Sequence, residues 1–478
     1  MKKIIGLVVI LAVLVLGSYY GTGMITERKV RETINIINQS NGLYAEIKNY
    51  DRGWFSSSAQ IDWNMMVPER VVSGADGQSK TIPAQKYELT MPLKINHGPV
   101  IFYDSGVKFG LGYAKTDIDL PPKYVKQFES LFTKESTKPQ VDLSLFVNYL
   151  AKTRIILSIP EFQLIAKEGS GKLNWQGMNT SISMNSDLSA VDGDLKINGM
   201  TYSQNEMKMT LAAVDSVYSL SKSSYGLFTG SASLSFPSLV VMNKDAKIFE
   251  LDDFDIESSS DISGEVVNSH LHMSLDSLLL NDQKYGPGNF EMAIRNLDAK
   301  AMGRINELSN QLQNGDEAQK QQTLVLLMQE LPKLVSQGPE IEVSQMEFKL
   351  PDGKIEGNML LSIPKQPDAN IMTIVQGVKG NAHLEIPRDL VRMAIADTIK
   401  KSIMNNQLQQ ALAQQNQNPM SVTEVHNQAQ SMADKRLDAM IDAGVFVKKD
   451  KDLVVDLQLE KGKLIINGKP FDANMIKF

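Results

Sequence analysis

The chain has 478 residues, no cysteine and a formal net charge of −6 at pH 7. Its length allows two or more domains, and 42% hydrophobic with 22% charged residues is typical of a folded protein. The lack of cysteine rules out disulfides, thiol catalysis and cysteine metal sites. The acidic balance argues against binding of nucleic acid, which relies on clustered Lys and Arg.

Residues 4–25, IIGLVVILAVLVLGSYYGTGMI, form an uncharged and largely apolar run. A helix of this length reaches about 33 Å, enough to cross the hydrocarbon core of a bilayer, and it satisfies its own backbone hydrogen bonds in lipid. The alternative is a cleaved secretory signal peptide, whose apolar region is normally only about 7–15 residues long. We expect an uncleaved anchor, through which the protein is held in the membrane.

The positive charges on the two sides of this run nearly balance, and two further facts favour one orientation. Lys2 and Lys3 precede the run, and a basic cluster at 28–31 follows it, flanked by Glu27 and Glu32. Because these glutamates dilute the second cluster, and because large domains translocate largely regardless of charge, we expect the body to lie outside the cytoplasm. In a bacterium with two membranes this describes a single-pass inner-membrane protein with its C-terminal body in the periplasm.

Alternating apolar and polar residues predict antiparallel strands in most of the body. The alternation is clear in 206–213, in 270–275 and in 354–363. A period of two residues is typical of a sheet with one dry and one wet face. Apolar residues with helical spacing replace this alternation in three places, at 26–39, 298–337 and 387–443. In the second of these, Pro332 should kink or restart the helix.

Local signals refine this prediction. Residues 351–353, Pro-Asp-Gly, predict a hairpin turn, as does the region around Gly462. A slip in apolar parity predicts a β-bulge at 344–345. The Gln/Asn-rich stretch 409–419 divides the third helical region and is expected to be a polar helix end, and Ser-Val-Thr-Glu at 421–424 has capping-box spacing.

The sequence thus predicts an α+β fold. An N-terminal transmembrane helix precedes a large, mainly antiparallel, elongated and curved β-sheet body with a few interrupting and C-terminal helices. We divide the chain into a signal anchor at 1–25, a juxtamembrane helix at 26–40, an N-terminal β-rich part at 41–297 and a helix-containing β-rich C-terminal part at 298–478.

Residues suited to catalysis or metal binding are few. His270 and His272 lie two apart in a predicted strand, so both rings share one face, a geometry that can start a metal site. His97 precedes Gly98 and Pro99, which impose a turn, so its ring either braces the backbone or takes part in catalysis. We expect a non-enzymatic protein with no catalytic residue, metal or cofactor. The alternative is a periplasmic hydrolase or metal-dependent enzyme that uses His97 or the His270/His272 pair.

Several motifs carry a family resemblance. After the anchor and its helix come NYDRGWFSSSAQ at 49–60 and NHGP at 96–99, and later a long run at 258–298 and GKLIINGKPF at 462–471. Together they resemble the YdgA-like or YihF-like bacterial envelope proteins, which share a domain of unknown function (DUF945). The resemblance implies a single-pass inner-membrane protein with a periplasmic body and brings no catalytic residues. Its most specific positions are Arg52, Gly53, Trp54, Phe55, Ser56, Ser57, His97, Gly98 and Pro99.

The first of these motifs has a structural interpretation and a binding interpretation. Gly53 permits a tight bend, after which Trp54 or Phe55 would anchor the returning strand in the core. Alternatively, the two aromatic side chains line a binding site near the membrane.

The predicted function follows from the one-sided strands and from the 24 methionines, which exceed the 16 phenylalanines. Flexible thioethers suit adaptable apolar surfaces. We expect an anchored sheet whose apolar side binds or shuttles a hydrophobic, lipid-like ligand or an extended peptide. The other possibility is a scaffold that recruits an envelope protein partner.

Overall fold

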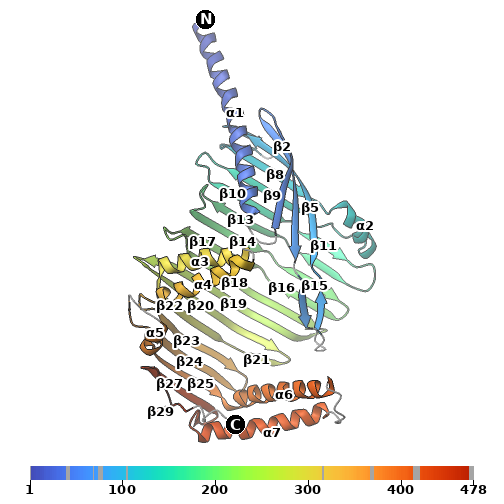
Figure 1. The fold of residues 1–478 in the computed structure, drawn as a ribbon. Helices are drawn as coiled ribbons and strands as arrows, with labels where there is room; N and C mark the ends of the chain where they lie inside the picture. Colours follow the sequence, from blue (N-terminus) through green and yellow to red (C-terminus); the bar gives the residue numbers. More distant parts are fainter. Residues whose placement is uncertain are drawn as a thin grey trace. The chain divides into compact units, whose positions relative to one another are not determined.

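The computed structural model describes residues 2–38, 43–67, 69–73, 79–103, 106–314, 317–366, 371–412 and 420–472. It confirms the α+β class, since antiparallel strands and several helices make up the chain (Figure 1). The chain divides into two compact units, Met1–Ser219 and Leu220–Phe478. The boundary predicted at residue 297 falls inside the second unit.

The first unit contains one long helix, α1 (Lys2–Ile37), and a short one, α2 (Pro122–Leu131). Its main antiparallel ladder runs, in hydrogen-bonding order, through β1 (Leu43–Arg52), β2 (Ser56–Val67), β5 (Gln85–His97), β8 (Gly112–Ile118), β9 (Val141–Val147), β10 (Thr153–Ile159), β13 (Met178–Met184), β14 (Ala190–Ile197) and β17 (Val214–Lys222). A second ladder joins β11 (Phe162–Ile165), β12 (Lys172–Trp175), β15 (Met200–Gln204) and β16 (Met207–Leu211). Two hairpins are separate, β3 (Arg70–Ser73) with β4 (Ser79–Ile82) and β6 (Ile101–Tyr103) with β7 (Gly106–Lys108).

The second unit has longer strands and more helices. Its antiparallel ladder runs through β18 (Phe228–Asn243), β19 (Ala246–Ser263), β20 (Val266–Leu280), β22 (Gly288–Asp298), β23 (Glu340–Leu350), β24 (Gly353–Ser362), β25 (Lys379–Pro387), β27 (Asp452–Glu460) and β28 (Lys463–Ile466). The short strands β21 (Gln283–Tyr285), β26 (Val447–Lys449) and β29 (Lys469–Pro470) pair with β20, β27 and β28. The helices are α3 (Ala299–Asn314), α4 (Glu317–Leu334), α5 (Ile371–Gly377), α6 (Arg388–Leu412) and α7 (Val422–Asp442).

The local predictions are largely confirmed. The register of β23 slips by one residue at 344–345, as expected for the bulge. Hairpin turns lie at 351–352 and 461–462, and the capping box at Ser421 is formed in full. Pro332 lies near the end of α4 instead of dividing it. Helix α6 ends at Leu412, and the rest of the Gln/Asn-rich stretch lies outside the described residues.

Helix α1 runs without interruption through the predicted anchor and the predicted juxtamembrane helix. Its second half packs on the β1–β2–β5 face, while its first half extends past the end of the sheet (Figure 1). Ile34 packs there in a core cluster with Ala45, Ile61 and Met91. Because these side chains are at most 7% exposed, the helix closes the core of the first unit.

The predicted transmembrane segment falls partly outside the described side chains, which exclude residues 4–13. Within the described part of the chain, no helix has both the length and the apolar character needed to cross a bilayer. The anchor at 4–25 therefore stays a prediction.

Candidate functional site

The motif residues from the two sequence segments meet at one end of the first unit's sheet. β1 and β2 are joined by the turn 53–55, and the end of β5 pairs with the start of β2, with Ser56 opposite Asn96. In the turn, the Gly53 amide donates to the Ser56 carbonyl oxygen at 2.9 Å. A Cβ atom on Gly53 would lie 2.6 Å from that oxygen, so the tight turn requires glycine.

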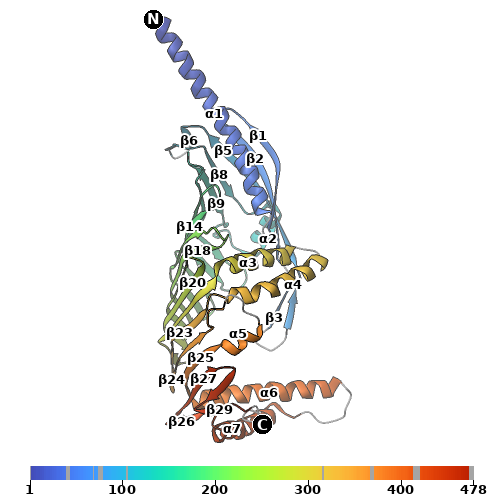
Figure 2. The same cartoon turned by 60° about the vertical axis from the view of Figure 1, so that its left-hand side comes forward.

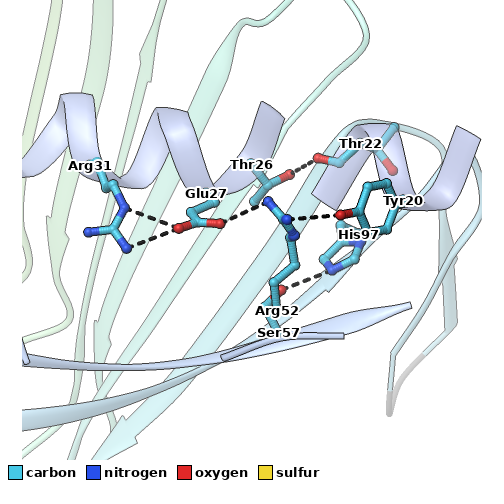
Figure 3. A network of polar contacts seen from close by, with 8 residues as sticks. All are labelled: Tyr20, Thr22, Thr26, Glu27, Arg31, Arg52, Ser57 and His97. Carbon is cyan, nitrogen blue, oxygen red and sulfur yellow. Dashed lines mark hydrogen bonds and ion pairs between the residues drawn. The ribbon is translucent and has the colours of Figure 1, made fainter. Parts of the chain in front are cut away.

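His97 and Ser57 form a buried polar pair under α1. The Nε2 atom of His97 lies 3.0 Å from the Ser57 Oγ (Figure 3), and the two residues are 1% and 4% exposed. Burial lowers the pKa of the His97 imidazole and outweighs the nearby backbone groups of Tyr19 and Ser56, which favour the charged form. A catalytic pair must reach its substrate, and this one is covered. The catalytic interpretation of His97 is therefore not favoured, and its ring braces the structure instead.

Two glycines let the helix approach the sheet closely. A Cβ atom on Gly23 of α1 would lie 2.6 Å from the His97 ring. A Cβ atom on Gly98 would lie 2.0 Å from the Tyr19 ring, and Gly98 also has a φ of +137°. A real Cβ atom at either position would force its neighbours to move, so the close packing of α1 on the sheet depends on both glycines.

A polar network ties the motif turn to the helix (Figure 3). The Arg52 guanidinium donates to the Glu27 carboxylate and to the Tyr20 hydroxyl, each at 3.1 Å, and lies 5.0 Å from the centre of the Tyr20 ring. The same Glu27 also pairs with Arg31 at 2.9 Å. Charge-assisted hydrogen bonds of this kind are the stronger ones, so Arg52 holds the turn against α1.

The expectation that Trp54 or Phe55 anchors the strand in the core is wrong. They are 57% and 54% exposed, because the turn lies beyond the sheet end and no layer covers it. Their rings pack instead against α1, Trp54 at 5.4 Å from Tyr20 and Phe55 at 4.9 Å from Tyr19 between centroids.

The face of α1 that makes these contacts is not apparent from the apolar run. The whole of 4–25 was expected to contact lipid, but Tyr19 and Gly23 of this run pack on protein. A signal was present, since small and hydroxyl residues recur at helical spacing within the run and are typical of packed helix faces. The buried or partly buried positions of this face are Tyr19, Gly23, Thr26, Val30 and Ile34.

His270 and His272 lie together on the polar side of the second unit's sheet. His270 Nε2 lies 3.0 Å from the Glu291 carboxylate, and this hydrogen bond lowers the pKa of Glu291. The cross-strand partners of His272 are Glu257 and Glu291. Even so, no group of three potential ligands in the described ranges is arranged to hold a metal ion.

The opposite side of this sheet carries cross-strand rows of apolar side chains. One row follows the pairing from β18 to β25, with glycine at its β24 position, and all its side chains are partly exposed; it contains Leu234, Ile256, Met273, Phe290, Met346 and Leu384. The neighbouring row on the other side is polar and contains Ser235, Asp255, Ser274, Asn289, Glu347 and Glu356. We call the first side the apolar face.

Figure 2 shows α3 and α4 on one side of the second unit's sheet, and the core contacts of Ala299 identify this side as the apolar face. Ala299 of α3 packs on Val267 and Leu227 at one end of the strands. Beside this contact the face has a hollow of about 290 Å³. Small residues and apolar side chains line most of it, and three residues of the polar side, Ser231, Ser259 and His270, also border it. The other lining residues are Leu220, Gly230, Ala232, Ser258, Ser260, Ser269, Leu271, Met292 and Ile294.

Comparison with known proteins gives the family. The family described as "Bacterial protein of unknown function (DUF945)" matches residues 1–474. Protein YdgA of Escherichia coli (strain K12) is 20% identical over 428 residues, which cover 81% of each chain. The chain therefore belongs to the DUF945 family, as the motifs around Arg52 and His97 predict.

Proposed function

We propose that this protein is anchored in the bacterial inner membrane by residues 4–25, with its body in the periplasm, and that the apolar face binds a long-chain, lipid-like ligand without catalysing a reaction. The observation that carries the ligand proposal is the apolar row from Leu234 to Leu384, whose side chains stay partly exposed.

The anchor is supported by the uncharged run and by the continuity of α1 across it. The second half of α1 belongs to the core of the first unit. A segment that packs into the folded body in this way is unlike a removable leader.

The ligand is supported by the energetics of the apolar face. Burying apolar area contributes about 25 cal/mol per Å², so a face of this extent gains from a hydrocarbon chain laid along it. The hollow of about 290 Å³ has the volume of a small ligand site and offers serine hydroxyls beside Leu271 and Met292. A long chain with a polar end matches this mixture.

The test uses the full chain in detergent and a fatty acid that carries a photoactivatable diazirine. We expect crosslinks on β20 and β22, at 271–275 and 290–294. The variant Met273→Gln/Phe290→Gln replaces two apolar side chains by polar ones, and should reduce crosslinking and copurified lipid several-fold.

The matched control places the same new side chains on the polar side, as Ser274→Gln/Asn289→Gln, and should crosslink like the unmodified protein. Equal labelling of both variants would contradict the ligand proposal. Crosslinks to an envelope protein in cells, with no lipid in the natively purified sample, would favour the scaffold instead.

A further inference from the structure

Three turns at the end of the first unit's sheet expose large apolar side chains around α1. They are the β1–β2 turn, the β5–β8 connection that contains β6 and β7, and the β9–β10 turn, and Figure 2 shows β6 beside the middle of α1. The six largest of these side chains are between 53% and 86% exposed. We call this set the rim, and it contains Trp54, Phe55, Phe102, Phe109, Tyr149 and Leu150.

The rim lies at a defined level of the helix. The Tyr19 hydroxyl donates to the Val100 carbonyl oxygen at 2.6 Å, and the Tyr149 hydroxyl donates to the Pro99 carbonyl oxygen. Together with the packing of Trp54 on Tyr20, these contacts place all three turns beside residues 19–20. This level is inside the apolar run 4–25.

The length of the helix then places the rim relative to a bilayer. Residues 4–18, which precede the contacts with the sheet, span only about 22 Å, whereas the hydrocarbon core is about 30 Å thick. The bilayer must thin, or the level of residues 19–25 must enter it together with the turns packed there. Exposed apolar turns favour the second solution, because they gain from leaving water.

The charges of the rim fit a lipid surface. In sequence, the three turns at 53–55, 98–111 and 148–152 contain two lysines, Lys108 and Lys152, and one acidic residue, Asp104. Lys108 Nζ lies 5.0 Å from the Tyr103 ring centre. Aromatic residues and lysines are the residues enriched where proteins meet the membrane interface.

We propose that the rim enters the interfacial layer of the same bilayer that holds residues 4–25, so that the first unit is seated on the membrane by its turns as well as by its helix. This inference rests on the proposed anchor. It assigns the two aromatic residues of the family motif to lipid contact.

Spin labelling of the full chain tests the proposal in vesicles of equal parts phosphatidylethanolamine and phosphatidylglycerol. Because the chain has no cysteine, the single variants Phe102→Cys, Phe109→Cys and Leu150→Cys each carry one nitroxide. We expect these labels to collide several-fold more with dissolved oxygen, relative to a water-soluble nickel complex, than a label at Val217→Cys, a 55% exposed position on β17.

A label at Leu14→Cys separates the rim from the anchor. If Leu14 is in lipid while the rim labels match Val217, the rim inference is overturned and the anchor stands. If Leu14 is in water, both fall. Rim labels shielded from both reagents would show a protein partner on these turns and would also overturn the inference.

Discussion

The two units treat their apolar sheet faces differently. In the first unit, α1 covers the face formed by β1, β2 and β5, where Ile95 and Ala45 are at most 1% exposed. In the second unit, the row from Leu234 to Leu384 stays partly exposed although helices lie on the same side. Close covering in the first unit depends on glycines that let a helix backbone approach, such as Gly23 and Gly98.

This difference predicts how sensitive each face is to mutation. A face covered by its own chain is part of a close-packed core, so each methylene group removed from it lowers the stability of the protein. A face whose side chains stay partly exposed can contact a ligand, and substitutions on it should cost less stability. The predictions below test this contrast in the full chain in detergent micelles.

The largest difference in stability should appear when a methionine is replaced by alanine on the covered face and on the apolar face of the second unit. Met91 is 3% exposed under α1, so Met91→Ala should lower the free energy of unfolding by about 2–5 kcal/mol. Met273 is partly exposed, and Met273→Ala should cost about 1 kcal/mol or less. Denaturant unfolding measures both, and equal losses would remove the contrast.

Gly98→Ala should destabilise the first unit by about 2–4 kcal/mol, because it adds a clash with Tyr19 to an unfavourable φ. The control is Gly169→Ala, where φ is +77° and no atom lies within 4 Å. This control measures the cost of the unfavourable φ alone, and should lower the free energy of unfolding by about 1 kcal/mol. The shift in unfolding midpoint reports both variants, and similar shifts would mean that the Tyr19 contact is unimportant.

Gly23→Ala and Gly21→Ala should have opposite signs. A Cβ on Gly23 meets the His97 ring, whereas a Cβ on Gly21 meets nothing within 4 Å. The first variant should cost about 1–3 kcal/mol, and the second should gain up to about 1 kcal/mol from helix propensity. Thermal melts followed by circular dichroism distinguish the two variants. Stabilisation by both would contradict the close contact between Gly23 and the His97 ring.

The smallest effect is a pH dependence from His97. Its pKa is lowered from 6.5 in the folded protein by burial, so the unfolded chain binds more protons there as the pH falls below about 6.5. Stability should therefore decrease with falling pH in this window. His97→Gln cannot titrate and should flatten the profile, and His426→Gln, exposed on α7, is the control for replacing a histidine elsewhere. Matching slopes in all three proteins would argue against burial of a neutral imidazole.

Much of the fold could be predicted because its signals are local. Alternation gives strands such as β20, the parity slip gives the bulge at 344–345, and Ser421 with Glu424 gives a capping box; each depends on neighbours within a few residues. Helix α2 was not predicted, and α5 was not either. Both are short, and short helices carry little periodic signal.

The candidate site was only half predictable. The motifs identified Arg52 and His97 but not their partners on α1. Gly23 lies in the run that was predicted to cross the membrane, and Glu27 lies in the predicted juxtamembrane helix. Trp54 or Phe55 was expected in the core after the bend at Gly53, and only the position of this turn beyond the sheet end shows that both are exposed.

By itself, the amino-acid sequence determined the α+β class, the apolar run at 4–25, the strand faces and the family, because hydrophobic period and motif spacing are written along the chain. Only the tertiary structure decided which apolar surface is covered. That outcome depends on contacts between distant segments, such as Gly98 beneath Tyr19, and such contacts follow from how closely two backbones can approach and not from the local order of residues.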